Sequence, residues 1–290
     1  MADTVICENV TKKYKDKLVL DNINLTLEAG KIYGLIGRNG AGKTTLLSIM
    51  SAQNPATSGN VSVCGMPVWE NREALKHVCF SRELMPGNNN GVCSLKVKDY
   101  FDAASFYYPN WDNEMAARLA GKFGLDKKKR MNKLSKGMLS MVTIIVALAS
   151  KAQFTFMDEP VAGLDIIARE LFYRELLDEF SETGRTFVIS SHILEEAADV
   201  FEETIIVHKG QILLNEDTQH LVGRAYSVNG PAELVEELLS EYEHHAVHGI
   251  GRSKSAVLLL KEGQSAPDHD MLTIQKMNLQ NIFVALCGEE

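Results

Sequence analysis

The sequence is poor in cysteine and has none of the cysteine patterns that form a disulfide framework or bind a metal. Its 290 residues include five cysteines, which are scattered along the chain and form no Cys-x-x-Cys pair. An odd and dispersed set of this kind argues against a disulfide framework and a cysteine-based metal site, and it fits a reducing cytoplasm. The first 17 residues carry charges and lack an apolar core, so we expect no secretory signal peptide there.

Long apolar runs and positive charge are also scarce. The longest apolar run, from about Met138 to Ala149, is broken by Ser140 and Thr143, and it is shorter than the roughly 20 residues that a membrane-spanning helix needs. We therefore expect any work at a membrane to depend on a membrane partner. A net charge of -8 and a pI of about 5.6 disfavour a dedicated nucleic-acid binder, which usually has a basic face, so we expect no nucleic-acid partner.

What is present is ordinary globular composition, with 45% hydrophobic and 23% charged residues. Short apolar runs alternate with helical patterns, which predicts an α/β fold with a mostly parallel, buried core sheet. The runs are Ile32–Ile36, Val61–Val63, Phe154–Met157, Thr186–Ile189 and Thr204–Val207, with a helix predicted at Ile166–Phe180. The alternating run Leu18–Leu27 instead predicts a half-exposed antiparallel strand.

Two segments depart from this alternation and divide the chain. The first, at about residues 86–149, begins with the turn-rich stretch Pro86–Gly91 and then becomes helical, which predicts an inserted helical subdomain within a domain of residues 1–217. The second, residues 218–290, predicts a compact C-terminal αβ domain. Its expected elements are strand Ala225–Val228, helix Ala232–Tyr242, strands Ala246–Gly251 and Ser255–Lys261, and helix Leu279–Cys287.

The octapeptide Gly37–Thr44 matches the Gly-x-x-x-x-Gly-Lys-Ser/Thr pattern of a phosphate-binding loop, and it lies between a strand-like and a helical run. Its glycines let backbone amides turn around phosphates, and the helix that follows adds its N-terminal dipole. Lys43 supplies a charge to the β- and γ-phosphates and Thr44 a hydroxyl to Mg²⁺. An ordinary glycine-rich turn is the alternative, but the lysine and threonine in this context favour a nucleotide.

Polar residues follow two of the predicted core strands. Asp158 and Glu159 come directly after Phe154–Met157, and His192 follows Thr186–Ile189. The carboxyl ends of buried strands are where α/β sheets bind ligands. We expect Asp158 to hold Mg²⁺ through water, Glu159 to act as general base toward the attacking water, and His192 to hydrogen-bond the γ-phosphate. Taken alone, the carboxylates would fit an acidic turn and the histidine a helix cap.

The segment Leu134–Gly137 precedes the apolar helix Leu139–Ala149. Ser135 and Gly137 at the start of this helix can form a small anion-binding site. By itself, the segment is explained more simply by Ser135 acting as an N-cap.

In their order along residues 1–217, these motifs resemble one family, the nucleotide-binding subunits of ABC transporters. Gly37–Thr45 is similar to the family's Walker A loop, Leu134–Gly137 to its signature motif, and Gly163–Asp165 to its D-loop. Asp158 and Glu159 stand where the family has the Walker B aspartate and the catalytic glutamate. The resemblance implies a P-loop NTPase with a mostly parallel core sheet, an antiparallel β subdomain, an inserted helical subdomain and a small C-terminal αβ appendage.

The resemblance also implies the roles of individual residues. Catalytic roles fall to Lys43, Glu159 and His192, the last as the family's switch histidine. Nucleotide contacts are expected from Tyr14, which stands where the family stacks an aromatic ring on adenine, and from Asn39, Gly40, Ala41, Gly42, Lys43, Thr44, Thr45, Ser135, Gly137 and Asp165. Metal contacts are expected from Thr44, Asp158 and Glu83.

The family assembly implied by this resemblance is a head-to-tail dimer around two ATP molecules, each with Mg²⁺. Each ATP would touch the phosphate loop of one subunit and the Ser135–Gly137 segment of the other. A separately encoded transmembrane permease would be the second partner. The chain would then be cytoplasmic and held at the inner face of the membrane through that permease.

The chain departs from the family pattern at two places. Lys136 and Met138 replace the first glycine and the glutamine of the usual signature. The glutamine of the family's Q-loop is missing, because no Gln occurs between Gln53 and Gln153, and Glu83 falls near its position. We expect hydrolysis to be retained and the coupling to the membrane partner to be unusual.

The C-terminal tail Asn278–Leu286 is similar to that of exporter ATPases for drugs, antibiotics and peptides. Two roles stay open for the C-terminal appendage. It would regulate the ATPase or mediate dimerisation, or it would only cover an edge of a sheet. The basic run Lys127–Arg130 fits a solvated loop better than attraction to anionic lipid. Two other functions stay open: a soluble ABC ATPase acting on a non-membrane partner, and a weakly catalytic regulatory half of a heterodimer.

Overall fold

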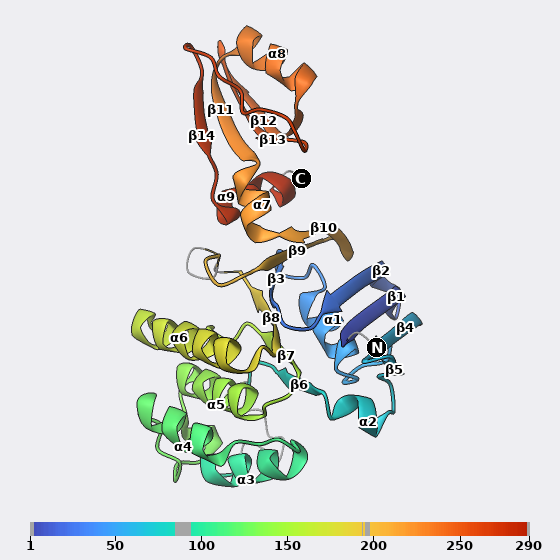
Figure 1. Ribbon diagram of the computed structural model, residues 1–290, viewed down its shortest axis with the longest axis vertical. Coiled ribbons are helices and arrows are strands. Elements are labelled where there is room, and N and C mark those ends of the chain that lie inside the picture. The colour runs from blue at the N-terminus through green and yellow to red at the C-terminus, as the bar shows by residue number, and fades with distance from the viewer. Residues whose placement is uncertain (1–2, 85–93, 193, 195–197, 289–290) are drawn as a thin grey trace.

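Six strands form the central sheet, in the order β10-β9-β3-β8-β7-β6 (Figure 1). The computed structural model describes residues 3–84, 94–192, 194 and 198–288. The strands are β3 (Ile32–Ile36), β6 (Val78–Ser81), β7 (Phe154–Asp158), β8 (Thr186–Ser191), β9 (Glu203–His208) and β10 (Gln211–Asp217). All pair in parallel except β10, which runs antiparallel to β9, and every residue of β3, β7 and β8 is buried. The predicted parallel core sheet is thereby confirmed for four of its five predicted runs.

The fifth run, Val61–Val63, was assigned to the wrong sheet. It belongs to β4 (Ser58–Val63), which pairs antiparallel with β1 in a second sheet of order β2-β1-β4-β5. The other strands of this sheet are β1 (Thr4–Tyr14), β2 (Lys17–Glu28) and β5 (Met66–Pro67). Only alternate side chains of β4 are buried, so its two valines do not indicate burial on both faces. The antiparallel strand predicted at Leu18–Leu27 is confirmed as β2.

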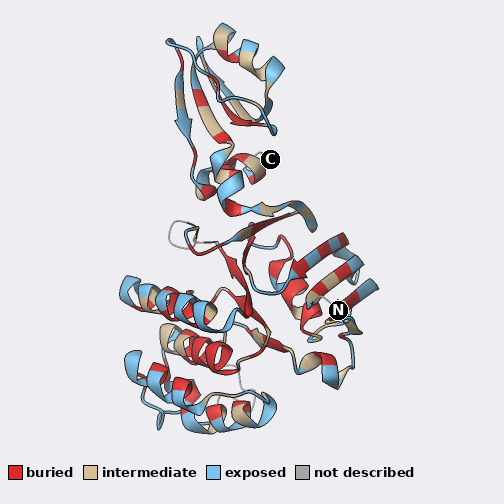
Figure 2. Cartoon of the chain, viewed as in Figure 1, coloured by how far each residue is buried: buried red, intermediate tan, exposed pale blue. Residues whose placement is uncertain are grey.

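Helices cover the central sheet on both sides. On one side lies α1 (Lys43–Met50), whose leucines share a buried cluster with both sheets. On the other side α3 (Val97–Tyr107), α4 (Asn113–Lys122), α5 (Lys136–Ala149) and α6 (Ile166–Thr183) stack together (Figure 1). Figure 2 shows α5 buried over most of its length, whereas α3 and α4 expose their outer faces.

The inserted segment is helical where the structure describes it, as predicted. The turn-rich stretch Pro86–Gly91 lies outside the described residues. Lys127–Arg130 is exposed, which agrees with a solvated loop. Within the described ranges, no helix has both the length and the apolar character needed to cross a membrane. The limits of the helical subdomain and the boundary after residue 217 stay predictions.

A buried carboxylate joins α4 to α6. The side chain of Glu175 is inaccessible to solvent, and its two oxygens bind Arg118, with Nη1 at 2.5 Å, and Lys122. Burial raises the pKa of this carboxyl, but the hydrogen bonds from Lys122 and Arg118 outweigh that effect and hold the pKa below its usual value. The charged form of Glu175 therefore stabilises the contact between the two helices.

We expect Glu175→Gln to lower the free energy of unfolding at pH 7 by about 1–3 kcal/mol, because two charge-assisted hydrogen bonds are weakened while both cations can rehydrate. Since the folded-state pKa is depressed, the stabilisation is present above the unfolded pKa and is lost as pH falls through the folded value. The variant and wild type should converge in acid. Denaturant unfolding at several pH values measures this, with exposed Glu182→Gln as the control on the same helix. Equal stability at pH 7 would contradict the prediction.

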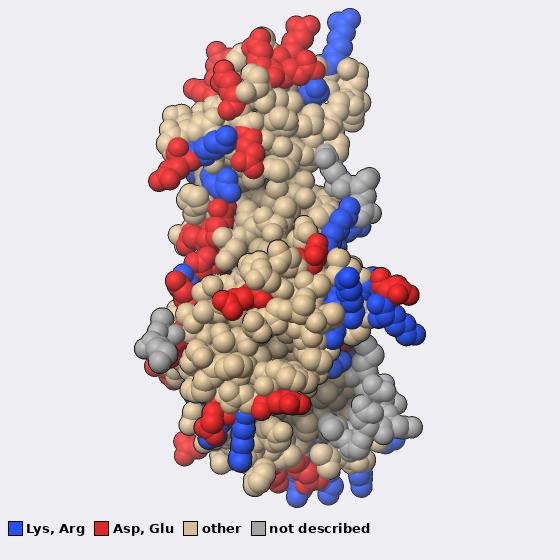
Figure 3. Space-filling view, turned by 90° about the vertical axis from the view of Figure 1, so that its right-hand side faces the viewer, with Lys and Arg blue, Asp and Glu red and all other residues tan. Residues whose placement is uncertain are grey.

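The C-terminal residues build a third sheet, of order β12-β13-β11-β14 and antiparallel throughout. Its elements are α7 (Thr218–Gly223), β11 (Ala225–Pro231), α8 (Ala232–Glu241), β12 (Glu243–Ile250), β13 (Ser253–Leu259), β14 (Thr273–Lys276) and α9 (Leu279–Cys287). The three predicted strands and two predicted helices are confirmed, and α7 and β14 were missed. Leu221 and Ile282 share a buried cluster with the main domain, so the apolar core continues across residue 217. Figure 3 shows carboxylates gathered at the end of the molecule that carries α8.

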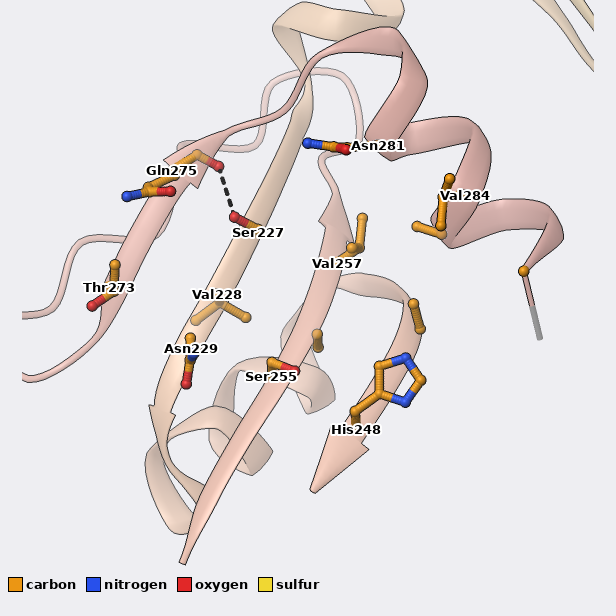
Figure 4. Close-up of a pocket in the computed structure, with 14 residues that line it drawn as sticks. Ser227, Val228, Asn229, His248, Ser255, Val257, Thr273, Gln275, Asn281 and Val284 are labelled. Atoms are coloured by element: carbon orange, nitrogen blue, oxygen red, sulfur yellow. Dashed lines mark hydrogen bonds between the residues drawn. The ribbon is translucent and has the colours of Figure 1, made fainter. Parts of the chain in front are cut away.

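A groove lies between one face of this third sheet and α9 (Figure 4). Its volume is about 820 Å³, and Ser227 on its wall donates a hydrogen bond to the carbonyl of Gln275 at 3.4 Å. The lining contains no Asp, Glu, Lys or Arg, and it includes Ser227, Asn229, His248, Ser255, Gln275, Asn281 and Val284. Its lining contains no residue of the phosphate loop.

Candidate nucleotide-binding site

The phosphate loop connects β3 to α1 and needs glycine at two of its positions. Gly42 has φ +112° and forms the N-cap of α1, and a Cβ there would lie 2.6 Å from Leu20 Cδ2. A Cβ at Gly37 would lie 2.6 Å from the carbonyl oxygen of Val207. At these two positions the loop runs so close to its neighbours that a side chain is excluded. The loop leads into the N-terminus of α1, where backbone amides can bind an anion.

Lys43 places a buried ammonium group inside the loop. Its Nζ donates to the carbonyl oxygens of Gly37 at 2.6 Å and Arg38 at 3.4 Å, and it lies 3.8 Å from Glu159 Oε1. Burial lowers the pKa of Lys43, while the charges of Glu159 and Asp158 oppose this effect. A cation fixed at this depth is positioned to bind phosphate oxygens.

Asp158 ends β7 and is held by the neighbouring strand. Ser190 on β8 is its register partner, and Ser190 Oγ donates a hydrogen bond of 2.7 Å to Asp158 Oδ1. The same hydroxyl accepts a hydrogen bond of 2.9 Å from the backbone N–H of Glu159. Ser190 thus fixes both acidic residues, and because its partners lie more than thirty residues away, sequence patterns did not assign it this role.

Glu159 connects the loop to His192. Its Oε2 is 2.6 Å from His192 Nδ1, and its Oε1 faces Lys43. The backbone of Glu159 has φ +50°, a left-handed conformation that costs a residue with a side chain on the order of 1–3 kcal/mol. Strain of this kind persists where the surrounding structure over-determines it, typically at functional sites. Through the contacts of Glu159, the three predicted catalytic residues Lys43, Glu159 and His192 lie together.

A hollow of about 250 Å³ opens over the phosphate loop. It is lined by Lys17, Val19, Asn39, Gly40, Gly42, Lys43, Thr44, Thr45 and Glu159. Ala41 is buried and is not part of this lining. Lys17 and Val19 were not predicted, because they belong to β2 and only the folded sheet brings them beside the loop.

Tyr14 is paired in the second sheet with a residue that lines this hollow. It is the register partner of Lys17, and its ring is 46% exposed. Lys12 Nζ lies 4.9 Å from the ring centroid, and Asn54 donates a hydrogen bond to the hydroxyl. An exposed ring steadied in this way can stack on a base, and the adenine contact stays a prediction.

The signature segment lies apart from the hollow of its own chain. Ser135 is the N-cap of α5, accepting a hydrogen bond of 3.2 Å from the N–H of Met138, which confirms the simpler interpretation of this serine. Ser135 is exposed, and a Cβ at Gly137 would lie 2.5 Å from the carbonyl oxygen of Gly163. Asp165 is likewise exposed and caps α6 through the N–H of Ala168 at 2.8 Å. None of these residues lines the hollow of its own chain, and their nucleotide contacts stay predictions.

Glu83 has a partner that sequence reasoning did not foresee. Its Oε1 is 2.7 Å from Lys136 Nζ, so the structure engages this carboxylate in an ion pair. The metal role predicted for Glu83 stays a prediction. In the described part of the chain, no three His, Cys, Asp or Glu residues cluster as metal ligands. Thr44 and Asp158 offer the hydroxyl and carboxylate oxygens that suit Mg²⁺ when phosphates supply further ligands.

Comparisons with known proteins agree with this geometry. The ABC transporter family model matches residues 20–162. The putative ABC transporter ATP-binding protein AlbC of Bacillus subtilis (strain 168) is 32% identical over 209 residues, which is 68% of this chain and 84% of that protein. The bacitracin transport ATP-binding protein BcrA of Enterococcus faecalis is 31% identical over 223 residues, 76% of this chain and 72% of that protein. The Nod factor export ATP-binding protein I of Rhizobium meliloti is 30% identical over 299 residues, 97% of this chain and 87% of that protein.

Solved structures show the same fold. An ATP-binding subunit of an ABC transporter matches with a TM-score of 0.65 at 20% identity, covering 82% of this chain and 98% of that one. A dimeric ATP-binding cassette in a post-hydrolysis state with ADP and Pi matches with a TM-score of 0.64 at 24% identity, covering 74% and 98%. The phosphate loop, the fold and these similarities lead to one assignment: the chain belongs to the ATP-binding subunits of the ABC transporter family, which are ATPases.

Proposed function

We propose that this chain is the ATP-hydrolysing subunit of an ABC exporter, in which two nucleotide-binding subunits close around ATP and drive a separate membrane subunit. The observation that carries the hydrolytic part is the contact of Glu159 with both Lys43 and His192 at the phosphate loop. A carboxylate in this place can take a proton from water at the γ-phosphate, a contribution of roughly 10²–10⁴-fold in rate.

The remaining groups act on the phosphates and the cation. Lys43 neutralises phosphate charge, and the loop amides and the start of α1 hold the phosphate oxygens. Thr44 and Asp158 would hold Mg²⁺, with Asp158 oriented by Ser190. Bound Mg²⁺ neutralises charge on the β- and γ-phosphates. His192, hydrogen-bonded to Glu159, orients that carboxylate toward the water.

The need for a second subunit is supported by the absence of two predicted nucleotide-binding residues from the lining of the hollow. Ser135 and Asp165 are exposed at helix N-termini, where anions bind favourably, but neither belongs to the hollow of its own chain. A second copy or a related subunit that docks head-to-tail would supply these groups to the ATP bound by the first. ATP would then join the two subunits, and hydrolysis would release them.

The exporter assignment is supported by relatives. Similar proteins are named for bacitracin transport and Nod factor export, and the second similarity extends over the C-terminal appendage. The protein would work at the inner face of the cell membrane through its permease, which would hold the substrate contacts. A soluble ABC ATPase and a regulatory half of a heterodimer are the competing functions, and the assembled Glu159–His192 pair argues against the second.

Purification of the tagged chain from membranes of its source tests the transport role. We expect an integral membrane protein to co-purify in stoichiometric amount and to change the rate of ATP hydrolysis after reconstitution into liposomes. Lys43→Ala, purified in parallel, should bind the same partner without hydrolysis. Recovery of an active ATPase with no membrane subunit, from both membrane and soluble fractions, would favour the soluble alternative.

A further inference from the structure

Lys136 and Glu83 are two of the residues at which the chain departs from the family pattern, and they contact each other. Lys136 is the first residue of α5 and stands between Ser135 and Gly137, while Glu83 lies two residues beyond the end of β6. The Nζ–Oε1 distance is 2.7 Å, and the side chains are 51% and 30% exposed. The hydrolytic groups described above involve neither residue.

The stem of Lys136 makes a second contact. Of the atoms that a Cβ at Gly163 would meet, the nearest are Lys136 Cγ at 3.0 Å and Cδ at 3.3 Å. Gly163 has φ +79° and belongs to the loop between β7 and α6 that also carries Asp165. One side chain therefore packs on this loop with its methylenes and binds the segment after β6 with its ammonium.

The ion pair is not what holds α5 to β6. Ser81 Oγ on β6 donates a buried hydrogen bond of 3.1 Å to the carbonyl oxygen of Thr143, in the middle of α5. The buried face of α5, which includes Val142 and Ile145, packs into the main apolar cluster. An exposed pair adds little to global stability, and its contact on α5 is made at the first turn. That turn carries Ser135 and Gly137.

We propose that Glu83 and Lys136 form one positioning unit that holds Ser135 and Gly137 in the orientation in which they meet ATP bound by a second copy of this chain. The inference rests on the proposed function, because only a two-subunit ATP site uses this turn. The loop that carries Asp165 is held by the same lysine stem, so both surfaces offered to the second copy are set by one side chain. Glu83 and Lys136 are thus positioning residues rather than catalytic residues.

A double-mutant cycle tests this coupling. In a Glu159→Gln background, ATP-driven dimer formation is followed by analytical ultracentrifugation for Glu83→Gln, Lys136→Gln and the double variant. Each single change should raise the ATP concentration for half-maximal dimerisation by about three- to fivefold, the scale of one exposed ion pair. The double variant should be no worse than the poorer single one, because both remove the same interaction. Lys136→Arg should restore near-wild-type behaviour.

Two further measurements separate positioning from a general defect. Binding of a fluorescent ADP analogue, measured at protein concentrations too low for dimers, should be unchanged in Lys136→Gln and Lys136→Arg. Lys254→Gln removes an ion pair of the same 2.7 Å length with Glu236 on the appendage and should leave dimerisation unaltered. If the losses from Glu83→Gln and Lys136→Gln multiply in the double variant, the proposal is wrong. If the Glu159→Gln parent itself forms no dimer with ATP, it is the proposed function that fails.

Discussion

Replacing Glu159 with Gln should reduce steady-state ATP hydrolysis by at least about 10²-fold while ATP still binds. Glutamine keeps the size of the side chain and can keep a hydrogen bond to His192, but its amide cannot accept a proton from water. The charge facing Lys43 at 3.8 Å also disappears, so nucleotide affinity should be retained or raised. Because hydrolysis is what separates the subunits, the variant should accumulate as an ATP-bound dimer.

The measurement is phosphate release at saturating ATP, combined with size-exclusion chromatography with and without ATP. Glu170→Gln, which changes an exposed glutamate on α6, serves as the control and should behave as wild type. Turnover unchanged from wild type would remove Glu159 from the mechanism. Loss of turnover without an ATP-dependent dimer would instead leave the base in place and contradict the two-subunit site.

The parts of this site that could be predicted are those encoded in one short stretch of chain. The phosphate loop is local, since glycine, lysine and threonine occur together between a strand and a helix. Asp158 ends β7 and Glu159 directly follows it, so one buried run was enough to place them at the sheet edge. Parallel pairing of β7 with β8 then brings His192 to the same edge, which a strand pattern also predicts.

The parts that could not be predicted depend on segments far apart in sequence. Ser190 reaches Asp158 only through the register of two strands, and Lys17 reaches the loop only through the second sheet. The pairing of Glu83 with Lys136 joins positions 53 residues apart, so their opposite charges carried no signal in the linear sequence. The prediction for Val61–Val63 was wrong for another reason. Two buried side chains in a short run do not specify which sheet the strand joins.

The contact between Glu83 and Lys136 joins two places at which the chain departs from the family pattern. Glu83, near the position of the missing Q-loop glutamine, has an ionic partner in the signature helix, at the one signature position where lysine replaces glycine. The two side chains are opposite in charge and contact each other. The unusual sequence is therefore better understood as one altered contact than as two separate losses.

Lys43→Ala should weaken ATP binding strongly while leaving the fold intact. Removing one partner of a buried charge-assisted contact costs about 2–5 kcal/mol, which is roughly 30- to 5,000-fold in affinity. The fold, by contrast, gains little from this lysine. Burial lowers its pKa, which means that the folded protein disfavours its charge, although Nζ still donates to the carbonyl oxygens of Gly37 and Arg38.

The cost of burying the ammonium and the gain from its hydrogen bonds oppose each other. We therefore expect the free energy of unfolding of Lys43→Ala to differ from that of wild type by less than about 1 kcal/mol. Isothermal titration with ATP and Mg²⁺ measures the affinity for ATP. Thermal unfolding with and without ATP measures how much bound ATP stabilises the folded protein. Wild type should gain stability as ATP is added, by mass action, and the variant should not. Lys13→Ala, an exposed lysine on β1, is the control and should respond to ATP as wild type does. An ATP-dependent rise in unfolding temperature equal to that of wild type would show that the ammonium of Lys43 does not bind phosphate.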